Sequence, residues 1–120
     1  MNMMKYGIKF KQGDILILPF PFTDLSSVKQ RPVLVISNDS YNDTTEDLII
    51  CGITSNPKNT IYSVSIDQKD LAEGRIPIAS RIKIDKIFTL KQSLAKMKVA
   101  RVKQNILGEV KKEIAKIFQI

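Results

Sequence analysis

Two apolar runs near the start of the chain most constrain what it can fold into. They cover residues 13–20 and 31–37, and both are rich in aliphatic residues. Their apolar residues are nearly continuous, which is typical of strands that are covered on both faces. A polar segment, residues 23–30, separates the runs. Pro19 and Pro21 are expected to end the first, because proline cannot donate to a strand ladder. The sequence therefore predicts two strands joined by a polar loop.

Short apolar segments separated by polar turns continue through most of the chain. The pattern predicts further strands at residues 47–54, 61–67, 76–84, 86–90 and 94–102. Turn-forming residues predict loops at 38–46 and 55–59 and a turn or short helix at 68–75. Alternation within two of the strands assigns these residues to one face: Tyr62, Val64 and Ile66 in the first, and Ile78, Ser80, Ile82 and Ile84 in the second.

A helix is predicted near the C-terminus, over residues 103–118. Its apolar residues recur at helical spacing: Ile106, Leu107, Val110, Ile114, Ile117 and Phe118. Gly108 is expected to weaken it by about 1 kcal/mol relative to alanine. Many short strands followed by one terminal helix predict a mainly β protein. We expect a small, strongly curved sheet or barrel with a helix packed on it.

The size and charge of the chain limit its organisation and its partners. Its 120 residues are the size of one domain, so a single domain is expected over residues 1–120. The net charge of +7 favours nucleic acid, an acidic protein or an anionic membrane as partner, although a solvated basic surface is a simpler alternative. No segment approaches the roughly 20 apolar residues of a membrane span. A single cysteine, Cys51, excludes an internal disulfide, and we therefore expect a cytoplasmic protein.

The sequence contains no histidine, which excludes several kinds of catalytic site. Ser-His-Asp triads, Cys-His dyads and histidine-ligated zinc are impossible. So is the pair of histidines that many metal-free ribonucleases use. No cluster of metal ligands is visible, and no cofactor is expected. Any phosphoryl chemistry must therefore rest on arginine, lysine, threonine, serine and carboxylates.

The two apolar runs and their link form one pattern, G-D-I-x-x-x-x-F-P-F-T-D-L-S-x-x-K-x-R-P-x-L-V-I-S, between Gly13 and Ser37. It resembles the MazF/PemK family of toxin endoribonucleases, from bacterial toxin–antitoxin pairs. The resemblance implies an SH3-like barrel of mostly antiparallel strands with a C-terminal helix. It also implies a homodimer that cleaves single-stranded RNA without a metal, by 2′-hydroxyl attack, leaving 2′,3′-cyclic phosphate and 5′-hydroxyl ends. A cognate antitoxin protein would inhibit it.

Arg31 and Thr54 are the catalytic residues that the resemblance implies. A guanidinium matches phosphate oxygens and stabilises a charged phosphorane, whereas its high pKa makes it a poor base. Thr54, at the end of the predicted strand 47–54, would orient the phosphate or the 2′-hydroxyl. Asp24, as a general base, and Ser80 are candidates for catalytic support. Outside this pattern, a lone Arg-Pro pair or a threonine at a strand end is more simply read as structural.

Basic residues near the predicted loops are expected to form a track for an RNA strand. They are Lys29, Lys58, Arg75, Arg81 and Lys83. Two other functions stay open at this point. One is a non-catalytic toxin on the same fold, like the gyrase poisons, in which Arg31 and Thr54 would be structural. The other is an SH3-like module that binds nucleic acid without cutting it.

Overall fold

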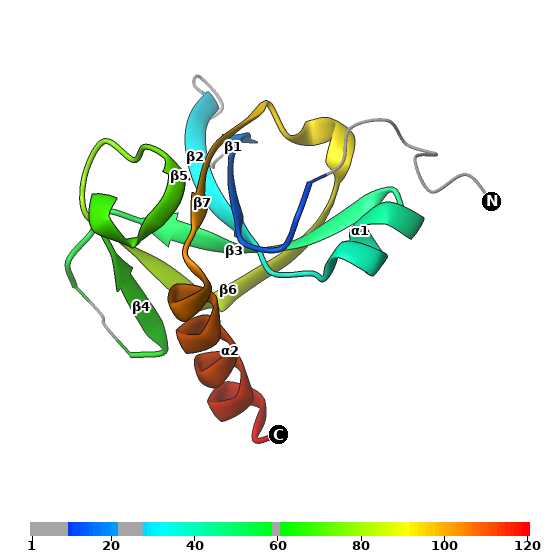
Figure 1. Cartoon of the computed structure of the whole chain (residues 1–120). Helices are drawn as coiled ribbons and strands as arrows, with labels where there is room; N and C mark the ends of the chain where they lie inside the picture. Colours follow the sequence, from blue (N-terminus) through cyan, green and yellow to red (C-terminus); the bar gives the residue numbers. More distant parts are fainter. Residues whose placement is uncertain (1–9, 22–27, 59–60) are drawn as a thin grey trace.

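The computed structural model describes residues 10–21, 28–58 and 61–120 (Figure 1). Within these ranges, seven strands form a single antiparallel sheet in the order β4-β6-β3-β2-β1-β7-β5. The sheet curls into a half-barrel, and the last helix runs on from the end of β7. The predicted mainly β fold, a small curved barrel of antiparallel strands with a C-terminal helix, is confirmed.

The elements have the following bounds. The strands are β1 (Asp14–Pro21), β2 (Val28–Val35), β3 (Asp47–Thr54), β4 (Ser63–Ile66), β5 (Leu71–Gly74), β6 (Ser80–Lys91) and β7 (Met97–Val102). The α-helices are α1 (Asp39–Thr44) and α2 (Gln104–Phe118), and the 3-10 turns are η1 (Gln68–Asp70) and η2 (Gln92–Leu94).

Apolar side chains are buried on both faces of the sheet. Leu34 packs on one side and its neighbours Val33 and Val35 pack on the other, and all three are inaccessible to solvent. The cluster that includes α2 contains Ile15, Leu34, Cys51, Ile53, Val64, Ile66, Leu71, Ile82, Ile84, Ala100, Val102, Ile106, Leu107 and Val110. The other contains Phe10, Leu16, Leu18, Val33, Val35, Leu48 and Ile50. Burial on both sides explains why β1 and β2 read as nearly continuous apolar runs.

β1 ends later, and β2 begins earlier, than the sequence predicted. β1 continues through Pro19 to Pro21, so the expectation that these prolines end the strand is wrong. Among the described residues, β7 pairs only with Asp14–Ile17 of β1, which leaves the far half of β1 with β2 on one side. Proline is tolerated there because the open edge needs no N–H donor. β2 begins at Val28, so residues 28–30 are strand and not loop.

Residues 38–46, predicted as a loop, contain the short helix α1. The side chain of Asn38 caps this helix by accepting a hydrogen bond of 2.8 Å from the backbone N–H of Tyr41. Asparagine and aspartate favour both turns and helix N-caps, so composition alone did not separate the two. Asn42, which is buried, donates to the carbonyls of Phe10 and Ser37 at 3.2 and 3.1 Å. These bonds hold α1 against the sheet.

β6 is one strand of 12 residues where the pattern predicted two. It carries a bulge opposite the middle of β3. Cys51 of β3 pairs with Ile87, but the next residue, Gly52, pairs with Lys83. Residues 84–86 therefore have no counterpart on β3, and the alternation of side chains shifts across the bulge.

The ends of three predicted strands differ from the structure. β6 begins at Ser80, and Ile78, assigned to the core-facing side, is instead 59% exposed. β4 begins at Ser63, so Tyr62 lies outside it, at a φ of +51°, whereas Val64 and Ile66 are buried as predicted. The predicted turn 68–75 contains η1 and then β5, and the predicted strand 94–102 shortens to β7.

Helix α2 follows the predicted segment closely, with Lys103 as its N-cap. Ile106, Leu107 and Val110 are buried, as the helical spacing predicts. Phe118, at the other end of the same apolar stripe, is 60% exposed. The helix packs against β4 and β6, and its last turn extends beyond them (Figure 1).

Replacing Gly108 with alanine should raise the free energy of unfolding by about 0.5–1 kcal/mol. Gly108 lies on the exposed face of α2, and a Cβ built there meets no atom within 4 Å. The change therefore removes backbone entropy from the unfolded chain without a steric cost. Urea denaturation measures the effect. Gly74→Ala is the matched opposite, because at φ +79° its Cβ would overlap the carbonyl of Val99. A Gly108→Ala variant less stable than wild type would contradict the expectation.

Asp14, at the start of β1, is a buried carboxylate with several partners. It is 1% exposed, and its Oδ1 lies 2.9 Å from Nη2 of Arg101 and 3.6 Å from Nζ of Lys98 on β7. Its Oδ2 accepts a hydrogen bond of 2.9 Å from the backbone N–H of Lys11. Glu73 of β5 pairs with the same Lys98 at 2.6 Å, at the surface. We call the side chains of Asp14, Arg101, Lys98 and Glu73 the Asp14 cluster. Their ion pairs connect β1, β7 and β5.

Candidate functional site

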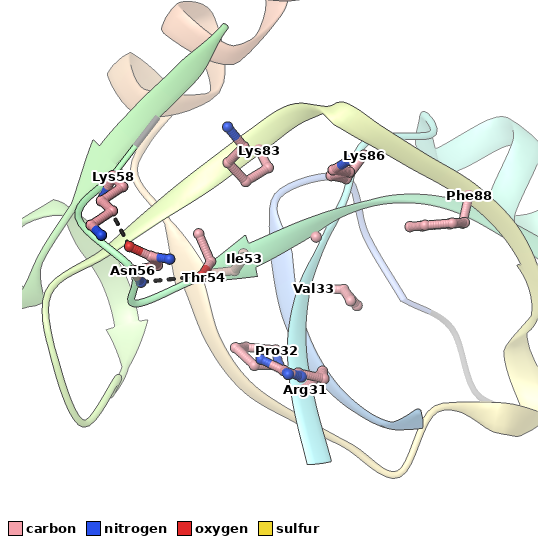
Figure 2. A pocket seen from close by; sticks show the side chains of 11 residues that line it. Arg31, Pro32, Val33, Ile53, Thr54, Asn56, Lys58, Lys83, Lys86 and Phe88 are labelled. Atoms are coloured by element: carbon pink, nitrogen blue, oxygen red, sulfur yellow. Dashed lines mark hydrogen bonds between the residues drawn. The ribbon is translucent and has the colours of Figure 1, made fainter. Parts of the chain in front are cut away.

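A cavity of about 390 Å³ is lined by the middle of β2, the end of β3 and the bulged part of β6 (Figure 2). We call it the first cavity. The described residues that line it are Arg31, Pro32, Val33, Gly52, Ile53, Thr54, Asn56, Lys58, Lys83, Lys86 and Phe88.

Strand register places Arg31 and Thr54 on the same side of the last β2–β3 pair. Val33 of β2 pairs with Gly52 of β3, and the strands are antiparallel. Arg31 and Thr54 each lie two residues beyond this pair, in the same direction, and both line the first cavity. The two residues singled out as catalytic candidates therefore lie together, although 22 positions separate them in the sequence.

Hydrogen bonds after β3 fix the hydroxyl of Thr54. Its Oγ1 accepts a bond of 3.1 Å from the backbone N–H of Asn56, and Oδ1 of Asn56 accepts one of 2.9 Å from the N–H of Lys58 (Figure 2). These two turns fold the segment so that Lys58 also lines the cavity. Because its oxygen accepts from Asn56, the Thr54 hydroxyl can direct its own proton into the cavity.

The bulge in β6 decides which side chains that strand contributes. In a regular strand, Lys83 and Lys86 would point to opposite faces, because successive side chains alternate. The extra residues shift the alternation, so that Lys83, Lys86 and Phe88 all line the first cavity. Lys86 and Phe88 were missed from the sequence. The signal that could have revealed them is Gly52, since a glycine inside a strand often marks a bulge.

The first cavity is cationic. Arg31, Lys58, Lys83 and Lys86 contribute positive charge, and none of the described lining residues is acidic. Lys83 is itself buried, with its ammonium 3.8 Å from the carboxylate of Asp85. Phe88 is 46% exposed and offers an aromatic face. Clustered cations beside an accessible ring suit a phosphate-bearing strand whose bases stack on aromatic side chains.

A second cavity, of about 370 Å³, adjoins the first. Arg31, Pro32 and Ile53 line both cavities. Ser80, a candidate for catalytic support, lines this second cavity and not the first. Its hydroxyl donates a bond of 2.9 Å to the carbonyl of Ile78. Ser80 is thus near Arg31, but it is not grouped with Thr54.

The other predicted site residues have different positions. Arg81 lines neither cavity; its Nε donates a hydrogen bond of 2.9 Å to the hydroxyl of Ser63 on β4. Lys29 belongs to β2, where its backbone pairs with Phe20, but its side chain lies outside the described part. Asp24 lies outside the described residues altogether.

The single cysteine cannot act as a nucleophile near neutral pH. Burial of Cys51, and to a smaller extent the nearby charge of Asp85, raises the pKa of its thiol to about 12. The thiol therefore stays protonated. Across the described ranges there is no group of three or more Cys, Asp or Glu side chains placed to hold a metal ion. Nor is any helix in those ranges long and apolar enough to cross a membrane.

One comparison with known proteins identifies a family, and another finds solved structures with the same fold. A family model described as "PemK-like, MazF-like toxin of type II toxin-antitoxin system" matches residues 11–118. The solved structure of an endoribonuclease in complex with its cognate antitoxin, from a mycobacterial species, is similar with a TM-score of 0.76 at 16% identity. The match covers 92% of this chain and 96% of that one. A comparison with curated proteins finds no match.

Two further solved structures have the same fold. The Mycobacterium tuberculosis toxin MazF-mt6 gives a TM-score of 0.73 at 15% identity, over 89% of this chain and 97% of that one. A MazE-MazF structure from Deinococcus radiodurans gives 0.76 at 21% identity, over 94% and 99%. At these identities the similarity shows a shared architecture over nearly the whole of each chain.

Proposed function

This chain belongs to the PemK/MazF-like family of toxins from type II toxin–antitoxin systems, and we propose that it is an endoribonuclease that cleaves single-stranded RNA. The observation that carries the proposal is the first cavity. There, Arg31 from the middle of β2 and Thr54 from the end of β3 line the same cavity, together with three lysines and an exposed phenylalanine. Structures with the same fold include an endoribonuclease in complex with its antitoxin, which supports the assignment.

In the proposed reaction, the RNA supplies its own nucleophile. The 2′-oxygen attacks the adjacent phosphorus, the bond from phosphorus to the 5′-oxygen breaks, and a 2′,3′-cyclic phosphate forms. The 2′-hydroxyl loses a proton and the leaving 5′-oxygen gains one, so the products are a cyclic phosphate and a 5′-hydroxyl. The enzyme must hold the attacking and leaving oxygens in line and stabilise the charge that accumulates on the phosphorane.

Arg31 would supply that stabilisation. Its planar guanidinium presents several N–H donors in a fixed geometry that matches two phosphate oxygens. A guanidinium is a donor with no acceptor, so we assign Arg31 as electrostatic stabiliser and donor and not as base. Thr54 would donate its hydroxyl proton to the phosphate or hold the 2′-hydroxyl, because its oxygen already accepts from Asn56. Asp24, outside the described residues, stays a prediction for the general base.

The cationic cavity also suits an inhibitor. We propose that the cognate antitoxin covers the first cavity with an acidic or amphipathic segment, which would compete with RNA for Arg31 and Lys86. A MazE-MazF structure is among those with the same fold. A homodimer, in which both subunits contribute to RNA binding, is part of the same proposal.

Cleavage of a defined strand tests the proposal. Purified protein is incubated with a long single-stranded RNA and, separately, with DNA of the same sequence, and the new ends are mapped. We expect discrete cuts in RNA with cyclic-phosphate ends, and intact DNA because it lacks the 2′-hydroxyl. Intact RNA after incubation with folded protein would reject the enzyme. It would favour a gyrase-poison type of toxin or a module that binds nucleic acid without cutting.

Removing divalent metal should leave cleavage unchanged. Arg31 and the three lysines of the first cavity would repel a divalent cation, and none of the described lining residues offers a carboxylate ligand. The initial rate of RNA cleavage is measured in EDTA and in Mg²⁺ at matched ionic strength, because added salt alone weakens RNA binding. A rate abolished in EDTA and restored by Mg²⁺ would overturn the proposed mechanism.

A further inference from the structure

The second cavity has no role in the reaction so far, although it shares the lining residues Arg31, Pro32 and Ile53 with the first. A phosphate held at Arg31 would therefore border both cavities. The volume of the second cavity, about 370 Å³, lies within the range of small-ligand sites, about 300–1,000 Å³. We propose that the second cavity is a subsite for the nucleotide next to the scissile phosphate, and that Arg75 binds the phosphate of that nucleotide. This inference rests on the proposed function.

Arg75 is the second arginine that lines the second cavity, besides Arg31. It lines the cavity, is exposed, and its guanidinium forms no ion pair with the described part of the protein. No acidic residue is found in the described lining of this cavity. An arginine without an ion pair that shares a cavity with Arg31 favours an anionic ligand that reaches both residues, such as a strand with successive phosphates.

The backbone around Arg75 is held in place on both sides. The side-chain amide of Gln68 donates a bond of 2.8 Å to the carbonyl of Gly74 and accepts one of 3.3 Å from the N–H of Ile76. The N–H of Arg75 itself donates to the carbonyl of Val99 at 3.2 Å. Gly74, at φ +79°, lets the chain lie directly on β7, where a Cβ would overlap that carbonyl. Arg75 is therefore an exposed residue on a fixed backbone, which lowers the entropy lost when it binds.

Two isoleucines close to Arg75 in the chain also line the second cavity. Ile76 packs on the core and so is fixed, whereas Ile78 is 59% exposed at the cavity. Exposed aliphatic side chains beside a cation suit a nucleobase that packs on them while its phosphate meets the arginine. Gln30 and Ser55 also line the cavity and bring polar groups that a base edge can meet.

Binding of an uncleavable strand tests the subsite apart from the chemistry. The probe is a fluorescent single-stranded 2′-O-methyl RNA that contains the cleavage sequence, measured by anisotropy over a range of salt concentrations. Arg75→Ala should weaken binding about tenfold and reduce the slope of log K against log salt by about 0.7, the loss of one phosphate contact. Lys111→Ala, an exposed cation on α2 away from both cavities, is the matched control and should change neither value.

Gln68 is a positioning residue, and its effect should depend on Arg75. Gln68→Ala should weaken binding in the wild-type background and add nothing in the Arg75→Ala background. A general loss of structure would weaken binding in both backgrounds, so this double-mutant cycle separates the two explanations. Thermal unfolding of each variant shows that the protein remains folded.

The outcomes separate the subsite from the proposed function. Wild-type affinity and salt slope in Arg75→Ala, with cleavage by the wild type, would reject the subsite and keep the endoribonuclease. Arg75-dependent binding without any cleavage would reject the endoribonuclease and keep a nucleic-acid site at the second cavity. Failure of the folded protein to bind any single strand would reject both.

Discussion

Replacing Arg31 with alanine should lower the rate of RNA cleavage about a thousandfold or more while the protein stays folded. Arg31 lines both cavities, and in the proposed reaction its guanidinium meets the phosphorane charge. In the Arg31→Ala variant, the lysines of the first cavity would remain. The two parallel N–H donors that a guanidinium presents to a phosphate would be lost. Single-turnover cleavage of a short RNA measures the rate, and thermal unfolding reports on the fold.

Two variants make this result specific. Arg31→Lys keeps the charge but loses the bidentate geometry, so it should recover only part of the lost rate. Lys111→Ala removes one positive charge on α2, outside both cavities, and should cleave like wild type. If Arg31→Ala cleaved at the wild-type rate, Arg31 would be structural and the catalytic assignment would fail.

Replacing Asp14 with alanine should lower the free energy of unfolding by roughly 3 kcal/mol. Asp14 is 1% exposed and holds Arg101 and Lys98 of β7 against β1. Its removal leaves both cations without their buried partner and frees the N–H of Lys11 from its acceptor. Urea denaturation, analysed with a common m-value, gives the free energy.

Glu73→Ala is the matched control for the Asp14 cluster. Glu73 pairs with the same Lys98, at 2.6 Å, but it is more than half exposed. Solvent screens an exposed pair, so its loss should cost much less than the loss of Asp14. Equal effects of the two substitutions would show that burial of Asp14 contributes little. Cleavage by the Asp14 variant, assayed where it remains folded, should persist, because Asp14 lines neither cavity.

The general fold could be predicted because the apolar patterns report burial directly. Residues 47–54 were predicted as the strand that forms β3, and the helical spacing of Ile106, Leu107 and Val110 identified the buried face of α2. The prolines of β1 led to a wrong end for that strand, because the effect of a missing N–H depends on whether a neighbouring strand is present. That neighbour is set by the sheet order, which a local pattern does not contain.

The candidate site was predictable only in part, for a similar reason. The resemblance singled out Arg31 and Thr54, and strand register brings them to one cavity. Lys86 and Phe88 were missed because the sequence predicted a separate short strand over 86–90, whereas in the structure these residues continue β6 beyond a bulge that only the pairing with β3 reveals. The side on which Ser80 lies depends on where β6 begins, four residues after the predicted start.

The bulge in β6 also limits how the length of this protein can vary. Residues 84–86 form the offset between the part of β6 that carries Lys83 and the part that carries Phe88. Deleting or inserting one residue there would exchange the two faces of the strand from that point on. Ile87 would then turn away from the core, and Phe88 would turn away from the first cavity. A change of two residues would leave both faces as they are, because side chains alternate with a period of two. Single-residue length variants of this segment should therefore be far less tolerated than most point substitutions within it.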